Sequence, residues 1–360
     1  MRDDLMKPTG IKEIADALGV SIGTVDRALH ARPGVSAKTC ARVLKMAEKL
    51  NYKPNVAARS LKLNRRLRIA VHLPRQIASF FDPVRQGVQA AAEAALGVRV
   101  DLDFRTYPRI GEDDTAMIER DLQRECDAII LTPGNPAHID PILRHFAERK
   151  IAVVCVASDA PRSPRLAAIS TDASISGGIA AELLTITVPK DGHVVAITGD
   201  LSTQDHAEKL RGFAATLATM APHLHLLPSV ESHERTEDAY RETLALLDRK
   251  QCPQGIYINT ANSLPVLRAL KERKLLGKMQ VVTTDLFPEL IPYIESGSVL
   301  ATLHQRPFTQ GKLAFETLLR YMVEGIVPET VTRLAPHIVL RSNLALFSNQ
   351  LLRKPATNIS

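Results

Sequence analysis

The chain has 360 residues, of which 45% are hydrophobic, and a formal net charge of +7. This length predicts two or three domains with a sizeable core, and no apolar run is long enough to suggest a membrane protein. The first residues are charged, so we expect a cytoplasmic protein without a secretory signal.

The positive charge is concentrated at the start of the chain. Residues 1–66 contain 14 Lys and Arg against 6 Asp and Glu, which gives +8, whereas the remainder contains 32 against 33, which gives −1. Lys and Arg can neutralise phosphates and release counterions, the usual source of sequence-independent affinity for DNA. A basic segment can also be only a solvated surface, but its coincidence with the helical motif at residues 11–29 favours phosphate contact.

The sequence predicts neither a metal site nor a cofactor. Its four cysteines lie far apart without metal-ligand spacing and are expected to be buried free thiols: Cys40, Cys126, Cys155 and Cys252. The chain also lacks a Gly-rich phosphate loop, a His-Glu-x-x-His motif and a serine nucleophile elbow. We therefore do not expect an enzyme.

Residues 11–29 predict a helix-turn-helix. Apolar residues at three- and four-residue steps place one face of a first helix inward, and these are Ile11, Ile14, Ala15 and Leu18. Gly19 can adopt a left-handed backbone and should end this helix, and Ser21 can cap the next one. The inward residues of the second helix are Val25, Ala28 and Leu29.

The second helix should then turn its other side outward, with Ile22, Gly23, Asp26 and Arg27 on it. Ser36 predicts the start of a third helix, which completes a three-helix core. The inner stripe of that helix is expected to be Val43, Leu44, Ala47 and Leu50. An ordinary amphipathic helix pair remains the alternative for these patterns alone.

Residues 7–62 resemble the DNA-binding head of the lactose/galactose repressor family. The matching pieces are Ile14-Ala15 before Gly19-Val20-Ser21, then Thr24-Val25, Arg27-Ala28-Leu29, Val35-Ser36, Lys38-Thr39, and Asn51-Tyr52 before Pro54-Asn55. Two positions depart from the family: Asp26 stands where a serine is usual, and Ile22-Gly23 replaces more polar pairs. The resemblance implies a DNA-binding domain over residues 1–53 that binds a two-fold symmetric, double-stranded operator as a homodimer.

We assign DNA-contacting roles within this head. Arg27 is expected to bond a guanine edge with two parallel hydrogen bonds, with phosphate binding as the alternative. Ile22 and Gly23 occupy the family's specificity positions, where Ile22 can touch a thymine methyl and Gly23 permits close approach. The residues expected to hold phosphates are Ser21, Thr24, Lys38 and Thr39.

Residues 54–66 are expected to form a hinge helix and linker. Pro54 cannot continue a helix and Asn55 is a good cap, so a short helix should run from Asn55 to about Leu61. A helix of only two turns is marginally stable on its own. The resemblance implies that the same segment of a second subunit and the minor groove support it, that Asn55 belongs to the DNA-binding surface, and that Leu61 wedges between base pairs. A flexible linker is the alternative.

Strand-like and helix-like segments alternate from residue 67 onwards, which predicts βαβ units around parallel sheets. The expected strands are 67–73, 98–104, 128–132, 151–156, 193–198, 226–230, 255–258, 280–284 and 299–303. The expected helices include 84–95, 175–187, 206–220, 238–248 and 264–273. Because the alternation repeats after residue 172, we expect two similar lobes.

Residues 67–342 resemble, more weakly, the effector-binding domain of the same family, which is related to periplasmic ribose-binding proteins. The resemblance implies an α/β fold of two lobes, each a parallel sheet with helices on both faces, behind the small all-α head. The N-lobe would comprise about 67–171 and 303–329, and the C-lobe 172–302 and 330–342, with crossings near 171, 302 and 330. The tail, 343–360, lacks sustained heptads, which disfavours a coiled-coil tetramer.

The resemblance places a ligand cleft between the lobes, at the carboxyl ends of the strands. The polar residues that follow strands and match the ligand-binding pattern are Asp159, Asn259, Asp285 and Gln305, whose carboxylates and amides suit a polyol. The two aspartates have a rival role as caps. Phe80 or Phe81, expected in the first strand-to-helix loop, would cover an apolar sugar face or pack in the core.

One position departs from the sugar-binding pattern. Where ribose-binding relatives carry an arginine ahead of Gly212-Phe213, this chain has Ala207. His206 or Lys209 could substitute for that arginine and would then favour an acidic or phosphorylated sugar.

These patterns predict a sequence-specific transcriptional regulator, a repressor controlled by a small sugar-like effector. The alternative is a carbohydrate-binding protein of the periplasmic type without a gene-regulatory role. The basic head and the missing signal argue against that alternative.

Overall fold

A computed structural model describes residues 10–29, 33–50, 66–123 and 125–352 of the chain. The contacts divide the chain into two compact units. The three helices of the head belong to one unit, and most of the α/β body belongs to the other.

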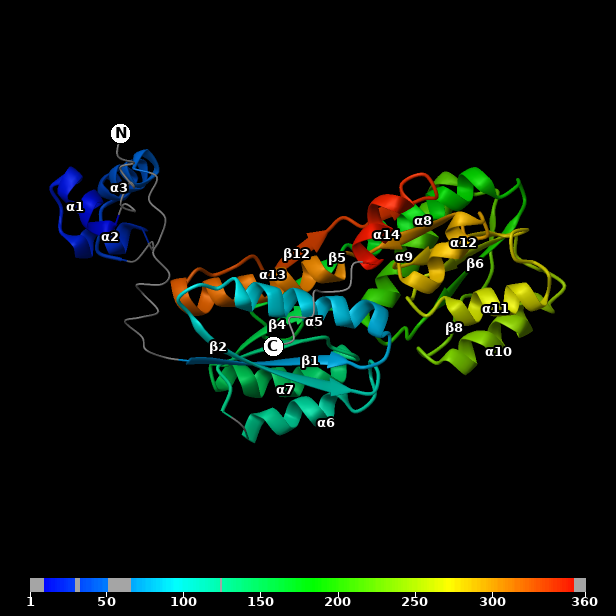
Figure 1. Cartoon of the computed structure of the whole chain (residues 1–360), viewed down its shortest axis with the longest axis horizontal. Coiled ribbons are helices and arrows are strands. Elements are labelled where there is room, and N and C mark those ends of the chain that lie inside the picture. Colours follow the sequence, from blue (N-terminus) through cyan, green and yellow to red (C-terminus); the bar gives the residue numbers. More distant parts are fainter. Residues whose placement is uncertain (1–9, 30–32, 51–65, 124, 353–360) are drawn as a thin grey trace. The chain divides into compact units, whose positions relative to one another are not determined.

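The head is a three-helix bundle made of α1 (Ile11–Leu18), α2 (Ile22–Leu29) and α3 (Ala37–Lys49), shown in blue in Figure 1. Gly19 ends α1 in the left-handed conformation, with φ of 64°, as the sequence predicts. The core of the head consists of Ile14, Ala15, Val25, Ala28 and Val43. The predicted inner faces of α1 and α2 are therefore confirmed.

The predicted face of α3 needs one correction. Leu44 is 51% exposed, so it does not belong to the inner stripe. Cys40 and Met46 pack against the core beside Ala47 and Leu50. Val43 lies at the centre of the buried face, and residues three or four positions from it share that face, whereas its neighbour Leu44 points about 100° away.

Removing the cap of α3 should destabilise the head. The Ser36 hydroxyl accepts a hydrogen bond from the Thr39 amide at 3.2 Å. Ser36→Ala should therefore lower the unfolding free energy by about 1 kcal/mol, measured by chemical denaturation followed by circular dichroism. Ser36→Asp, which retains an acceptor, should unfold at nearly the same denaturant concentration as the unchanged chain, and equal losses in both variants would contradict the capping role.

The first lobe contains a six-stranded sheet in the order β12-β5-β4-β3-β1-β2. Its strands are β1 (Arg66–Pro74), β2 (Arg99–Tyr107), β3 (Ala128–Leu131), β4 (Ala152–Val156), β5 (Ala167–Thr171) and β12 (Val331–Leu334). Helices α5 (Ala78–Glu93) and α13 (Pro307–Leu319) lie on one face, and α6 (Asp114–Glu119) and α7 (Pro136–Glu148) on the other (Figure 1). A 3-10 turn follows α6 at Arg120–Gln123, and a π-helical turn follows α13 at Arg320–Glu324.

The second lobe contains a seven-stranded sheet whose main order is β13-β11-β10-β9-β6-β7. Its strands are β6 (His193–Thr198), β7 (His225–Leu226), β8 (Val230–Glu231), β9 (Gly255–Ile258), β10 (Gln280–Thr284), β11 (Ala301–His304) and β13 (His337–Val339). One face carries α8 (Ala173–Thr187) and α9 (Gln204–Met220). The other face carries α10 (Thr236–Leu247), α11 (Leu264–Glu272), a 3-10 turn (Pro288–Leu290), α12 (Ile291–Glu295) and α14 (Leu344–Leu352).

Alternate strand residues explain why both faces are covered. In β6, Val195 and Ile197 enter the core under α10 and α11, whereas Val194 and Ala196 enter the core under α8 and α9. Strands that are apolar on both sides require helices on both faces. The predicted two-lobed α/β class is therefore confirmed, although β13 runs antiparallel to β11.

Four predicted boundaries are corrected. The third crossing lies at residues 335–336 instead of near 330, because β12 pairs with β5 in the first lobe and β13 with β11 in the second. The second crossing follows β11 and therefore lies after residue 304. The single strand expected at 226–230 is two short strands, β7 and β8, which both pair with β6. Helix α5 begins at Ala78, six residues before the predicted start.

The cysteines are free thiols, but only one of the four is buried as predicted. Cys155 is buried in β4, and burial raises the pKa of its thiol to about 12. Cys40, Cys126 and Cys252 are half-buried.

Candidate DNA-binding surface and effector cavity

The exposed side of α2 carries the residues that were assigned to base contact. Ile22 is 54% exposed, and Gly23 and Arg27 are also exposed. A Cβ built on Gly23 would lie 4.0 Å from Nη2 of Arg27, so the guanidinium runs back along the helix to the predicted specificity pair. Asp26, the fourth residue expected on this side, is half-buried.

The residues assigned to phosphate contact lie at the N-termini of α2 and α3. The Ser21 hydroxyl accepts from the Thr24 amide at 3.1 Å, and Lys38 is exposed in the first turn of α3. Thr39 is half-buried, and its hydroxyl lies 2.9 Å from that of Ser36. Helix N-termini favour bound phosphate because their amides point outward and the dipole is positive there. Asn55 and Leu61, the two residues assigned to the hinge, lie outside the described residues.

A cavity lies between the two lobes of the body. Most of its polar side chains follow the carboxyl ends of strands in both lobes, where ligands bind in open α/β sheets. The lining residues are Ile77, Phe80, Phe81, Ile110, Thr132, Ala157, Ser158, Thr203, Asp205, His206, Lys209, Glu234, Thr260, Ala261, Asp285 and Gln305.

Five of the seven residues expected at the effector site line this cavity: Phe80, Phe81, His206, Asp285 and Gln305. The two phenylalanines are buried in the first turn of α5, not in the loop where they were expected. Their rings meet edge to face with centroids 4.9 Å apart and form the apolar part of the wall.

Asp159 and Asn259 do not line the cavity, which corrects the sequence-based assignment. The Asp159 carboxylate forms an ion pair with Arg165, whose Nη2 donates to Oδ2 at 2.6 Å. Asn259 is fully buried, and its Nδ2 donates to the carbonyl of His206 at 3.4 Å. In each case an adjacent residue, Ser158 or Thr260, lines the cavity instead.

Asp285 is held rigidly at the end of β10. Its Oδ1 accepts from the Gln305 amide at 3.0 Å, and its Oδ2 accepts from Nε2 of Gln305 at 2.7 Å. Its backbone is left-handed, with φ of 65°, an uncommon conformation for a residue other than glycine. Burial raises the pKa of the Asp285 carboxyl to about 6, although Lys209 and the two hydrogen bonds from Gln305 act in the opposite direction.

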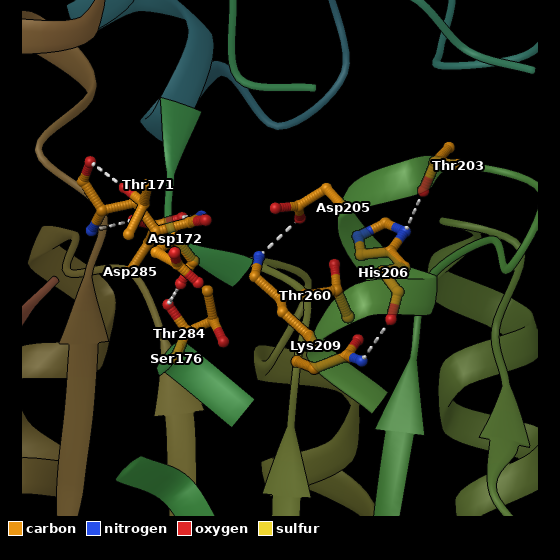
Figure 2. Close-up of polar contacts among 12 residues, drawn as sticks. Thr171, Asp172, Ser176, Thr203, Asp205, His206, Lys209, Thr260, Thr284 and Asp285 are labelled. Carbon is orange, nitrogen blue, oxygen red and sulfur yellow. Dashed lines mark hydrogen bonds and ion pairs between the residues drawn. The ribbon is translucent and has the colours of Figure 1, made fainter. Parts of the chain in front are cut away.

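Lys209 extends from α9 toward the cavity and pairs with Asp205 one turn earlier (Figure 2). Its Nζ lies 2.6 Å from Oδ2 of Asp205, and the residue is 1% exposed. Helix α8 fixes this part of α9 by close packing, because a Cβ on Gly177 would lie 2.0 Å from the Lys209 carbonyl oxygen. The ammonium group is therefore already neutralised by a carboxylate on the same helix.

His206, Glu234 and Thr260 form a second polar cluster in the wall. Nδ1 of His206 lies 3.1 Å from both the amide nitrogen and the carbonyl oxygen of Asp200, and Nε2 lies 3.2 Å from Oε1 of Glu234. Thr260 donates its hydroxyl to the same carboxylate, at 2.7 Å from Oε1. Gly199 makes room for this arrangement, because a Cβ there would lie 1.9 Å from Oε1 of Glu234.

Sequence reasoning missed Glu234 as a cavity residue. Glu234 follows β8, so the rule that found Asp285 also applies to it. The expected strand ended at residue 230, close to the end of β8, but Glu234 lies three residues beyond β8, in a left-handed bend.

The charge of the wall is acidic. Three carboxylates, on Asp205, Glu234 and Asp285, face the cavity, against one ammonium group on Lys209. A small anion would therefore meet two carboxylates that no lysine or arginine of the wall neutralises.

Two family models match the chain. Residues 69–325 match the periplasmic binding protein domain, and residues 10–55 match the lacI family of bacterial regulatory proteins. Catabolite control protein A of Priestia megaterium is 22% identical over 343 residues, which cover 92% of this chain and 98% of that protein. The HTH-type transcriptional repressor PurR of Edwardsiella ictaluri is 25% identical over 347 residues, covering 93% of this chain and 96% of the repressor.

The solved structure of GanP, a glucose-galactose binding protein from Geobacillus stearothermophilus, has a TM-score of 0.71 and 22% identity, and covers 78% of this chain and 99% of its own. This likeness shows the bilobal fold. No helix in the described ranges could cross a membrane, and no cluster of His, Cys, Asp or Glu in those ranges could hold a metal ion. The chain belongs to the periplasmic binding protein domain family and carries, at its N-terminus, the helix-turn-helix of the lacI family of bacterial regulatory proteins.

Proposed function

We propose that the chain is a sequence-specific transcriptional repressor that binds a two-fold symmetric operator as a homodimer and responds to a small effector held between its lobes. The observation that carries this proposal is the exposed face of α2, where Ile22, Gly23 and Arg27 lie together on a basic head. Relatives that align over nearly their whole length include the repressor PurR, which supports regulation as the role of both parts. A DNA-binding head also supports a cytoplasmic location and disfavours the periplasmic alternative.

The effector that suits the cavity best is a neutral polyol. Carboxylate and amide oxygens on Asp285 and Gln305 can accept hydrogen bonds from adjacent hydroxyls, and Phe80 and Phe81 offer an apolar surface to a sugar ring. An acidic or phosphorylated sugar is disfavoured, because Lys209 is already paired and Glu234 and Asp285 would repel the added charge.

Gel shifts with DNA from upstream of the coding sequence and from neighbouring promoters test the regulatory role. We expect salt-sensitive, sequence-selective binding to at least one fragment, with bound species whose mobility corresponds to a dimer. Binding that is equally strong to every fragment, or no binding at low salt, would contradict the proposal.

Effector affinity should fall in mild acid. Ionised Asp285 accepts hydrogen bonds from effector hydroxyls, and its pKa of about 6 means that about a tenth of it stays ionised at pH 5. We therefore expect about tenfold weaker binding at pH 5 than at pH 7.5, measured by isothermal titration calorimetry with the polyol that gives the largest thermal shift. His304, whose pKa burial lowers to about 4, does not titrate in this range. Asp285→Asn should flatten the profile, and an unchanged profile in that variant would assign the effect to another group.

A further inference from the structure

The loop that carries Glu234 joins the cavity to a contact between the two lobes. This loop, residues 232–235, follows β8 and precedes α10. His233 and Glu234 both have left-handed backbones, with φ of 49° and 53°. Such a conformation persists in non-glycine residues only where the surroundings impose it.

The end of β6 imposes this conformation. The Ser232 amide donates to the Thr198 carbonyl, and the His233 amide donates to the Gly199 carbonyl, both at 2.9 Å. The loop is therefore a rigid bend attached to the end of β6. It directs the Glu234 carboxylate to Thr260 and His206 in the cavity wall.

The main chain of the same residue faces the first lobe. The Glu234 carbonyl accepts a hydrogen bond from Nε2 of Gln76, which lies between β1 and α5. The backbone amide of Gln76 donates to the Pro108 carbonyl at 3.1 Å. Ile77, the next residue after Gln76, lines the cavity. Both partners of this interlobe hydrogen bond are thus part of, or adjacent to, the cavity wall.

We propose that Glu234 contacts the effector and couples it to the closed arrangement of the lobes. This inference rests on the proposed function of the cavity. An effector hydroxyl that donates to the Glu234 carboxylate restrains the 232–235 bend, and the restrained bend keeps its carbonyl in position for Gln76. Effector binding and lobe contact then stabilise each other, because each favours the same conformation of one residue.

Hydrogen–deuterium exchange of the full chain tests the coupling without an effector. Glu234→Gln keeps the size of the side chain but weakens its hydrogen bonds to Thr260 and His206. This variant should raise the rate of amide exchange at least threefold, both at residues 232–236 and at residues 75–77 in the opposite lobe. Gly199→Ala should do the same, because its Cβ would displace the carboxylate. The control is Glu231→Ala, in the same region but paired with exposed His233, which should leave 75–77 unchanged. Faster exchange confined to 232–236 in the first two variants would overturn the coupling.

A calorimetric panel of D-ribose, D-galactose and myo-inositol tests the effector contact. Glu234→Gln should change the rank order of affinities, whereas Gln76→Leu should weaken every probe that binds three- to tenfold and preserve the order. An unchanged order in Glu234→Gln would overturn the contact. If no probe binds the unaltered chain, the polyol proposal fails, and the exchange experiment still decides the coupling.

Discussion

Replacing Asp285 with alanine should weaken effector binding about 100-fold. The carboxylate is held by two hydrogen bonds from Gln305, and Asp285 lines the cavity. The alanine variant would lose two hydrogen bonds from effector hydroxyls to this charged carboxylate. Their loss costs about 3 kcal/mol, which corresponds to about two orders of magnitude in the dissociation constant. Isothermal titration calorimetry at pH 7.5, with the polyol that gives the largest thermal shift, measures this loss.

Asp159→Ala is the matched control for Asp285→Ala. Both carboxylates follow strands and were expected at the effector site, but Asp159 pairs with Arg165 outside the cavity lining. Its removal should lower the melting temperature while the dissociation constant changes less than about twofold. If Asp159→Ala weakened binding as much as Asp285→Ala, the cavity described here would not be the effector site.

Replacing Arg27 with alanine should weaken operator binding by about 1 to 3 kcal/mol and flatten the preference for one base pair. The side chain is exposed on α2, and its guanidinium lies beside Gly23 at the start of that helix. Fluorescence anisotropy with the operator, and with operators changed at one position at a time, measures affinity and preference together.

Two further variants separate base contact from charge. Arg27→Lys keeps the positive charge but cannot form the parallel pair of hydrogen bonds, so it should lose base preference nearly as fully as alanine. Lys38→Ala should weaken all DNA sequences equally, because a phosphate contact carries no sequence information. Retained base preference in Arg27→Ala would exclude Arg27 from base recognition.

The head was predictable because its signals are local. Capping by Ser36, the left-handed turn at Gly19 and the spacing of Ile14 and Ala15 each depend on residues within one or two turns. The error at Leu44 has a local cause as well, since Leu44 lies about 100° around α3 from the buried Val43 and is exposed.

The strand-end rule predicted part of the cavity. Asp285 and Gln305 follow strands with clear apolar patterns, so the strand-end rule located them. Asn259 was one residue away from the cavity-lining Thr260, because a single step at a strand end reverses the direction of the side chain. Glu234 was missed although it also follows a strand, because its position depends on a left-handed bend fixed by β6, a contact between residues more than 30 positions apart.

The central claim is that a ligand between the lobes changes how tightly the head holds DNA. Operator affinity of the full chain, measured by fluorescence anisotropy with and without a saturating concentration of the polyol identified by thermal shift, tests this claim directly. The account predicts at least a tenfold change in the dissociation constant for the operator, and no such change in Asp285→Ala at the same polyol concentration. Equal operator affinity of the unaltered chain with and without bound polyol would contradict it.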